Sequence, residues 1–203
     1  MNQPTFQVQF PEYSGLRCLM MPYIQGEPAS VPDEFAPYRD VVGAVFIRKG
    51  DVGFLTIDES PVTAGTCHRG KRAKYGRALH TEAGRSPEGS LCWGGGTWGG
   101  NTNVLLARDV RVLIGSNIDE TSAVWDAEHV NTSSDGDIGD VSHLYPYETA
   151  TLLRAGDVHE IGILTPHESL PARQTTNRQF LRIVSAGVYG REPYFTQNPL
   201  VQP

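Results

Sequence analysis

The sequence of 203 residues has few cysteines and no long apolar run. Its three cysteines, Cys18, Cys67 and Cys92, are odd in number and widely spaced, so they predict neither a disulfide framework nor a zinc-binding CxxC pair. No stretch approaches the roughly 20 apolar residues that cross a bilayer. The N-terminus also lacks the basic and apolar regions of a signal peptide. We therefore expect a cytoplasmic protein that does not contact membranes.

Basic residues are in the minority. Lysine and arginine total 17 against 23 aspartates and glutamates, which gives a net charge of -6. The densest basic cluster, Arg69, Lys71, Arg72 and Lys74, falls in a predicted loop, where a solvated turn is the simpler interpretation. This charge balance argues against nucleic acid as a partner and leaves a small-molecule substrate as the expectation.

Helical periodicity is nearly absent from the sequence. The best helix candidate spans residues 32–39, and Pro37 would cut it short. In contrast, 22 glycines and 14 prolines separate many short apolar or alternating segments, which is typical of strands joined by turns. We expect one all-β domain over residues 1–203, folded as a double-stranded β-helix (jelly roll) with few short helices. The expected strands are 6–10, 16–23, 41–48, 52–57, 77–82, 103–107, 110–116, 123–126, 149–154, 158–164 and 178–186, with hairpin turns at 49–51 and 108–109.

Two segments are expected to be irregular. Residues 92–100, CWGGGTWGG, are rich in glycine and contain Trp93 and Trp98, but they lack the lysine of a phosphate-binding loop. This segment is either a lid whose tryptophans cover a substrate, or a close backbone crossing whose tryptophans fill the core. Residues 131–140 are small and acidic without the terminal glutamate of a calcium-binding loop, so they predict a solvated surface loop.

The segment 155–183 has a pattern with chemical meaning. A Gly156–Asp157 turn leads into an apolar strand that reaches Pro166, where proline interrupts strand pairing. His167 follows directly, at a position from which an imidazole can point into the mouth of a barrel. Arg178 begins the next apolar strand, where its guanidinium can pair with a carboxylate near His167.

The run GDVHEIGILTPHESLP, residues 156–171, resembles the strands that bear the distal histidine in Fe(II)/2-oxoglutarate oxygenases and related cupins. In that superfamily a Gly-Asp turn precedes an apolar strand and then a histidine ligand. An arginine or lysine further along binds the far carboxylate of 2-oxoglutarate. Here His167 follows Gly156 by 11 residues, and Arg178 follows His167 by another 11. The resemblance is confined to about thirty residues of this chain.

The superfamily's other ligands form a His-x-Asp/Glu pair near the start of the barrel, matched here by His80-Thr81-Glu82. Because alternate residues of a strand share a face, His80 and Glu82 would point together toward one ion. With His167, the resemblance implies a two-histidine, one-carboxylate triad for Fe(II), which leaves positions open for 2-oxoglutarate and oxygen.

Two other histidines and two other classes of protein stay open as alternatives. His159 follows Gly156 by three residues, as in the second cupin motif, and it would serve a metalloenzyme that does not use 2-oxoglutarate. His129 is a weaker candidate, since Asn131 is a poor iron ligand. A metal-free jelly roll that binds a small molecule, a glycan or a protein is the remaining alternative.

Taken together, these patterns favour an Fe(II)- and 2-oxoglutarate-dependent oxygenase that acts on a small molecule. The expected metal ligands and catalytic residues are His80, Glu82 and His167, and Arg178 is expected to bind 2-oxoglutarate. Trp93 and Trp98 are expected at the substrate. Small β-barrels often dimerise through an edge strand, so a homodimer is a further expectation.

Overall fold

The computed structural model of the protein describes residues 4–67, 77–94, 101–130 and 133–201. Over these residues the structure is mostly β with a few short helices, as the sequence predicts. The strands are β1 (Phe6–Gln7), β2 (Arg17–Ile24), β3 (Val52–Val62), β4 (Ala83–Arg85), β5 (Leu91–Trp93), β6 (Asn101–Leu106), β7 (Arg111–Ser116), β8 (Ser122–Val124), β9 (Thr151–Leu152), β10 (Asp157–Gly162), β11 (His167–Ser169), β12 (Thr176–Val184) and β13 (Val188–Tyr189). The helices are α1 (Arg39–Ala44) and the 3-10 turns η1 (Pro28–Ser30), η2 (Asp33–Tyr38), η4 (Gly139–Leu144) and η5 (Tyr147–Thr149).

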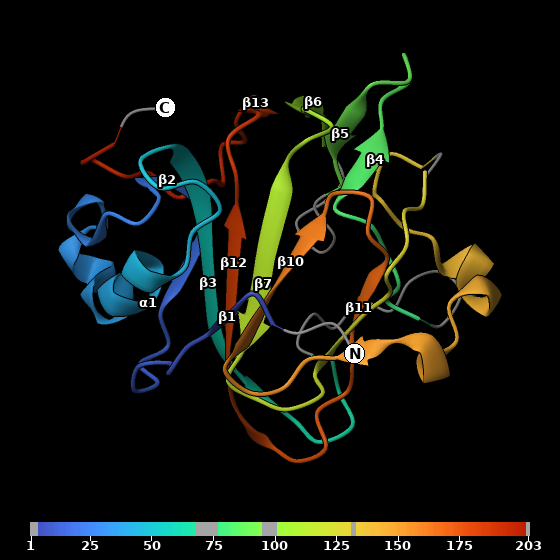
Figure 1. The fold of residues 1–203 in the computed structure, drawn as a ribbon, viewed down its shortest axis with the longest axis horizontal. Helices are drawn as coiled ribbons and strands as arrows, with labels where there is room; N and C mark the ends of the chain where they lie inside the picture. Colours follow the sequence, from blue (N-terminus) through green and yellow to red (C-terminus); the bar gives the residue numbers. More distant parts are fainter. Residues whose placement is uncertain (1–3, 68–76, 95–100, 131–132, 202–203) are drawn as a thin grey trace.

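The strands form three antiparallel sheets. The largest has six strands in the order β1-β10-β7-β12-β3-β2, and Figure 1 shows β3, β12, β7 and β10 side by side in it. A second sheet has the order β11-β8-β9, and a third, at the top of Figure 1, has the order β13-β6-β5-β4. Strands that are distant in the chain, such as β3 and β12, therefore lie next to each other, whereas β4, β5 and β6 follow one another in chain order.

The pairing is that of a long hairpin wound into a barrel. Strand β3 pairs with β12, the segment around His80 pairs with β11, β7 pairs with β10, and β8 pairs with β9. The four pairs are nested, because each joins segments that lie closer together in the sequence than the pair before it. Successive pairs alternate between the six-stranded sheet and the β11-β8-β9 sheet. This winding makes the domain a double-stranded β-helix, or jelly roll.

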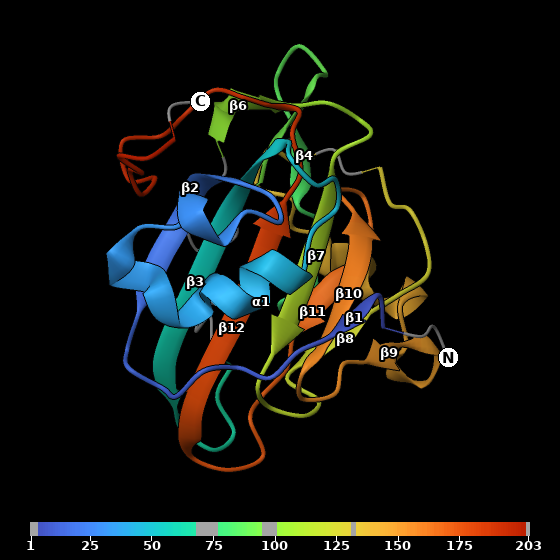
Figure 2. The same cartoon turned by 60° about the vertical axis from the view of Figure 1, so that its left-hand side comes forward.

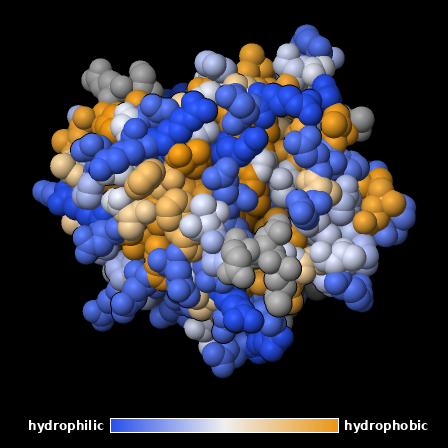
Figure 3. All heavy atoms as spheres, in the orientation of Figure 1, coloured by the Kyte–Doolittle hydropathy of each residue, from blue (hydrophilic) through white to orange (hydrophobic). Residues whose placement is uncertain are grey.

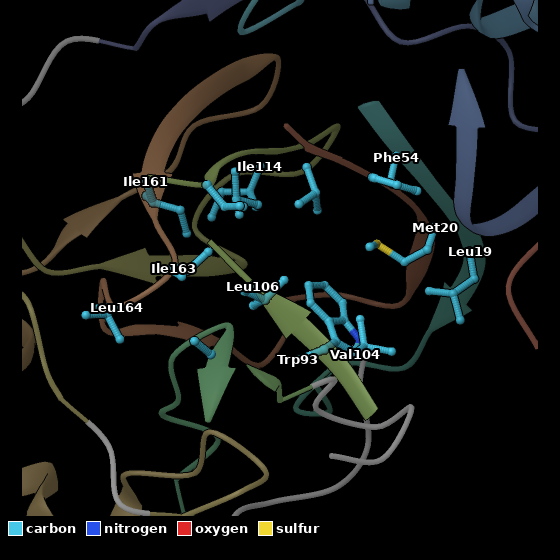
Figure 4. Packing of buried hydrophobic residues seen from close by; sticks show 14 of the residues in the cluster. Leu19, Met20, Phe54, Trp93, Val104, Leu106, Ile114, Ile161, Ile163 and Leu164 are labelled. Carbon is cyan, nitrogen blue, oxygen red and sulfur yellow. The ribbon is translucent and has the colours of Figure 1, made fainter. Parts of the chain in front are cut away.

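The six-stranded sheet is apolar on both faces. Its inner face contributes Ile114, Ile161 and Val184 to a cluster between the sheets, and Figure 4 shows Trp93 and Leu106 in the same cluster. The outer face packs a second cluster against α1 and η2, which lie across the sheet in Figure 2. Alternate residues of each strand thus serve two different cores.

The predicted strand at 41–48 is wrong, because residues 39–44 form α1. The buried apolar residues of this region are Phe35, Tyr38, Val42 and Val45, and they recur at helical spacing of three or four residues. Pro37 lies inside η2 and does not end the helical stretch, which continues into α1. The hairpin expected at 49–51 is therefore absent, since no strand precedes it.

Residues 108–109 do form a turn, but the strands on either side belong to different sheets. Strand β6 pairs with β5 and β13, whereas β7 pairs with β10 and β12. The turn therefore carries the chain from one sheet to another. Sequence patterns identify such a turn but not the partners of the strands that it joins.

The loop predicted at 131–140 is only partly solvated over the residues that the structure describes: Ser134, Asp135 and Asp140 are exposed, whereas Gly136, Ile138 and Gly139 are buried. Residues 133–138 run beside 79–85, where the Thr81 amide donates to the Gly136 carbonyl at 2.9 Å and the Ile138 amide donates to the Leu79 carbonyl at 3.2 Å. Ile138 is buried with Leu79 and Trp125 in a third apolar cluster. This segment thus supports residues 79–82, which include His80 and lead into β4.

The surface seen in Figure 3 is mostly polar, with smaller apolar areas among the charged side chains. The three cysteines are free thiols, and Cys18 and Cys92 are buried. In the part of the chain that the structure describes, no helix is long and apolar enough to span a bilayer.

Candidate metal and ligand pocket

His80, Glu82 and His167 line one buried cavity of about 40 Å³. His80 and His167 lie opposite each other in an antiparallel bridge, with amide-to-carbonyl hydrogen bonds of 3.0 and 2.9 Å. Directly opposed residues place their side chains on the same face of a sheet, and the two imidazole rings are 4.2 Å apart between centroids. The winding of the barrel thus brings together the three side chains that the sequence analysis selected.

Backbone carbonyls orient both imidazoles in the same way. The Nδ1 atom of His80 lies 2.7 Å from the Ala78 carbonyl oxygen, and that of His167 lies 2.9 Å from the Thr165 carbonyl oxygen. A carbonyl oxygen can only accept a hydrogen bond, so each Nδ1 must carry the proton. This leaves Nε2 of each ring as the atom that can bind a metal, and such outer hydrogen bonds are typical of metal-binding histidines.

Glu82 lies between these histidines and a buried arginine. Arg182, on β12, donates from Nη1 to both carboxylate oxygens of Glu82 at 3.2 Å. Burial alone would raise the pKa of Glu82, but the Arg182 cation, with help from His167 and His80, holds that pKa far below its ordinary value. The carboxylate is therefore an anion at neutral pH. Its Oε1 is 3.6 Å from Nε2 of His167, a gap longer than a hydrogen bond.

Arg178 enters the same cavity from the start of β12. It is 2% exposed, and its guanidinium donates to the Thr121 hydroxyl at 3.2 Å and the Ser122 hydroxyl at 3.3 Å. The guanidinium also lies 5.1 Å from the ring centre of Phe180. Arg178 and Arg182 are four residues apart on one strand, so both point into the barrel.

Trp93 does not cover this cavity. Its side chain is completely buried in the core between the sheets, where the Arg182 guanidinium lies 4.7 Å above its ring. The expectation of a substrate contact at Trp93 is corrected on this ground, because a ring with no exposed surface supports Arg182 rather than meeting a ligand. Trp98 lies outside the described residues.

Two further charged residues hold the His80 segment in place, and the sequence analysis assigned neither a role. Arg77 donates from Nε and Nη2 to Glu168 at 2.9 and 2.7 Å, and its Nη1 donates to the Ser142 and Tyr145 carbonyls. Glu168 also accepts a hydrogen bond from the Ala78 amide at 3.0 Å. Since Glu168 directly follows His167, this pair fixes the register between 77–80 and β11.

The alternative histidines do not line this cavity. His159, on β10, is buried at the side of the barrel, where it lines two other clefts. The Nδ1 atom of His129 lies 2.9 Å from the Tyr145 hydroxyl oxygen. His143 is exposed in η4.

The donor set of the cavity suits a divalent metal ion. It consists of two imidazole nitrogens and one ionised carboxylate, the set that many non-haem iron sites use. Among the residues that the structure describes, no three histidine, cysteine, aspartate or glutamate side chains are already arranged to hold a metal ion. Because Glu82 faces Arg182, a bound ion would have to share the carboxylate with this arginine.

The nested strand pairs define the class of fold as a jelly roll. Comparisons with known proteins add little information about the function. No family model matches the chain, and no curated protein matches it. Among solved structures, the crystal structure of EvdO2 from Micromonospora carbonacea var. aurantiaca is similar over 88% of this chain and 74% of that chain. The sequence identity is 12% and the TM-score is 0.38. A likeness this distant has no bearing on activity.

Proposed function

We propose that the protein is a jelly-roll metalloenzyme, and specifically an Fe(II)- and 2-oxoglutarate-dependent oxygenase acting on a small molecule. The observation that carries the proposal is the meeting of His80, Glu82, His167 and Arg178 in one buried cavity. Segments distant in the chain supply these residues. Three of these side chains, Glu82, His167 and Arg178, are almost fully buried, and burying ionisable groups at one point lowers stability, which argues for a ligand role.

Each side chain has a distinct task in this proposal. His80 and His167 would bind the metal through Nε2, because their Nδ1 protons are held by backbone carbonyls. Glu82 would add a negative charge, and Arg182 would keep that carboxylate ionised and turned in one direction. When bound, iron and 2-oxoglutarate would supply the oxidising chemistry, with succinate and carbon dioxide as coproducts.

Arg178 would hold the far carboxylate of 2-oxoglutarate. Its guanidinium offers donors in a planar fork that matches a carboxylate, and its neutral hydroxyl partners, Thr121 and Ser122, can remain as further donors. Phe180 and Ile114 give the cavity apolar walls that exclude water from the reacting atoms.

The size of the cavity supports a second candidate, a cupin-like metalloenzyme that does not use 2-oxoglutarate. About 40 Å³ accommodates a metal ion with about one water, since one water occupies roughly 30 Å³ in the liquid. A dicarboxylate would require Phe180 or the hydroxyl partners of Arg178 to move. A metal-activated water acting on a small substrate needs no such movement.

The test is an anaerobic titration of the metal-free protein, first with Fe(II) and then with 2-oxoglutarate. The oxygenase proposal predicts saturable iron binding and then a weak metal-to-ligand absorption band. His167→Ala should lose both with its β-rich circular dichroism unchanged, whereas His143→Ala, which removes an exposed histidine, should keep both. Iron binding without the band favours the second candidate. If the folded protein binds no divalent metal, both candidate functions are contradicted, and the result favours a metal-free jelly roll.

A further inference from the structure

Two adjoining clefts open at the side of the barrel, away from the cavity around His80. One has a volume of about 750 Å³ and the other about 330 Å³, and Thr151 and His159 line both. The residues that line them come from β1 and β10, at the edge of the six-stranded sheet, from β9 of the second sheet and from the segments beside these strands. Figure 2 shows the three strands near one another. Clefts of this size are within the range that small molecules occupy.

Asp157 and His159 form the polar floor of the larger cleft. They are alternate residues of β10 and therefore share a face, while Val158 between them packs into the core beneath α1. Asp157 is 9% exposed and His159 is 7% exposed. Within the described part of the chain, neither side chain makes a hydrogen bond or an ion pair.

Neither residue has a polar side-chain atom that is both buried and without a partner, so the polar atoms of Asp157 and His159 reach the cleft. A buried charge or imidazole without a hydrogen bond lowers stability unless solvent or a ligand reaches it. Burial lowers the pKa of His159, opposed by the nearby Asp157 carboxylate, so the imidazole is neutral at physiological pH. A neutral imidazole both donates and accepts hydrogen bonds, whereas an ionised aspartate only accepts them.

The charged residues that line the two clefts are Asp119, Glu120, Asp126, Arg154, Asp157 and Glu160, so acidic residues outnumber the one arginine among the described residues that line them. Glu120 pairs with Arg173, and Glu160 lies 3.8 Å from Arg111. Asp119 accepts a hydrogen bond from the Ala155 amide at 2.9 Å. Asp157 therefore remains as the buried carboxylate that a ligand can neutralise.

We propose that Asp157 and His159 form a second binding site, for a small molecule that carries a protonated amine or a guanidinium group. Asp157 would accept hydrogen bonds from the cationic group, and His159 would bond to a neighbouring N–H or hydroxyl. Ala150 and Leu152 in the cleft wall would contact the alkyl part of the ligand. The proposal does not depend on a metal at His80.

The experiment is an NMR titration of the metal-free, ¹⁵N-labelled protein with agmatine, which has a primary amine and a guanidinium on one alkyl chain. Sorbitol serves as a neutral probe and glutarate as an anionic one. We expect saturable shifts with agmatine at the amides of residues 5–7 and 151–159. The amides of His80 and His167 should not move.

Asp157→Asn should weaken agmatine binding at least about tenfold, because a charge-assisted hydrogen bond is lost. The matched control is Asp109→Asn, which removes an exposed carboxylate that lines neither cleft and should leave the affinity unchanged. His159→Gln is a second variant, and circular dichroism checks that each one folds. The site is disproved if agmatine gives no saturable shifts, or if Asp157→Asn binds it as well as wild type. Preferential binding of sorbitol or glutarate would disprove the cationic class.

Discussion

Glu82 is a buried carboxylate with an arginine on one side and two histidines on the other. Its charge is balanced by Arg182, which is itself 1% exposed and also donates to the Thr56 hydroxyl. Neither charge can be hydrated where it lies, so removing one leaves the other uncompensated.

We therefore expect Glu82→Gln to lower the free energy of unfolding by about 3–5 kcal/mol in the metal-free protein, the usual cost of breaking a buried ion pair. The amide keeps the shape of the side chain but cannot neutralise Arg182. Urea denaturation followed by circular dichroism measures the difference.

The matched control for this substitution is Glu128→Gln. Glu128 pairs with Arg108 at 3.3 Å, but both side chains are mostly exposed. A surface pair contributes little, so the control should change stability by less than about 1 kcal/mol. If both variants lose the same small amount, the Glu82–Arg182 pair is not the buried interaction described above.

At the scale of single residues, the resemblance to the oxygenase and cupin superfamily singled out His80, Glu82, His167 and Arg178, which line one cavity in the structure. The strand predicted at 77–82 does not form, since His80 makes only an isolated bridge and Glu82 lies in a bend before β4, yet both side chains line the cavity. Arg182 was visible as an arginine within an apolar strand, but its partner lies 100 residues away. Local sequence patterns do not reveal which distant residues pair with each other. The pair of Arg77 and Glu168 was missed for the same reason.

At the scale of elements, the segment 133–138 packs closely against residues 79–85, which include His80, and the two segments share backbone hydrogen bonds. Gly136 has a φ of +76°, and a Cβ atom there would lie 2.3 Å from the Thr81 carbonyl oxygen. Any side chain at residue 136 would push the two segments apart. The position of His80 and Glu82 thus depends on a glycine in another segment.

Gly136→Ala should therefore destabilise the protein more than Gly65→Ala. Gly65 has the same φ of +76°, but a Cβ atom there meets nothing within 4 Å. Both variants incur the left-handed backbone cost of roughly 1–2 kcal/mol, and the clash should add about 1–3 kcal/mol at residue 136 alone. Thermal or urea unfolding measures both, and equal losses would contradict the close approach.

The helix α1 shows why strand prediction failed in one place. Val41, Val42 and Val45 belong to a β-branched run, which favours a strand when judged over a short window. Over a longer window the run continues the helical spacing set by Phe35 and Tyr38, and the outer face of the sheet supplies the surface that buries them. Tertiary burial overrode local propensity here.

At the scale of the whole molecule, Glu59 connects three parts of the structure. Its Oε2 accepts hydrogen bonds from the amides of Ser14, Gly15 and Leu16, at 2.8, 2.6 and 3.0 Å. Its Oε1 accepts from the Tyr38 hydroxyl at 2.7 Å and from Gln179 Nε2 at 2.8 Å. One carboxylate thus joins the N-terminal segment, the helical layer and the six-stranded sheet.

These hydrogen bonds make the stability of the protein depend on pH. Burial would raise the pKa of Glu59, but the bonds from Gln179, Tyr38 and the Ser14 and Leu16 amides outweigh it and bring the pKa below its ordinary value of 4.5. A carboxyl with a depressed pKa in the folded state stabilises fully above its unfolded pKa, and this contribution is lost as the pH falls through the folded value.

Glu59→Gln should therefore lose about 1–3 kcal/mol at neutral pH, the range for hydrogen bonds to a charged group. Between about pH 6 and pH 3 its stability should fall less than that of wild type, because the titrating group is gone. Denaturation midpoints across this pH range test the prediction. Glu148→Gln, at an exposed carboxylate, should follow the wild-type curve, and a Glu59→Gln curve parallel to wild type would contradict it.

The nested winding of the barrel has a consequence for how the chain reaches its native state. His80 and His167 become neighbours only when the two halves of the chain have closed around each other, so their encounter spans nearly half the sequence. A ligand that binds both imidazoles at once therefore stabilises the native barrel relative to partly folded forms. Such a ligand would slow global opening, and above its dissociation constant it would raise the melting temperature roughly with the logarithm of its concentration.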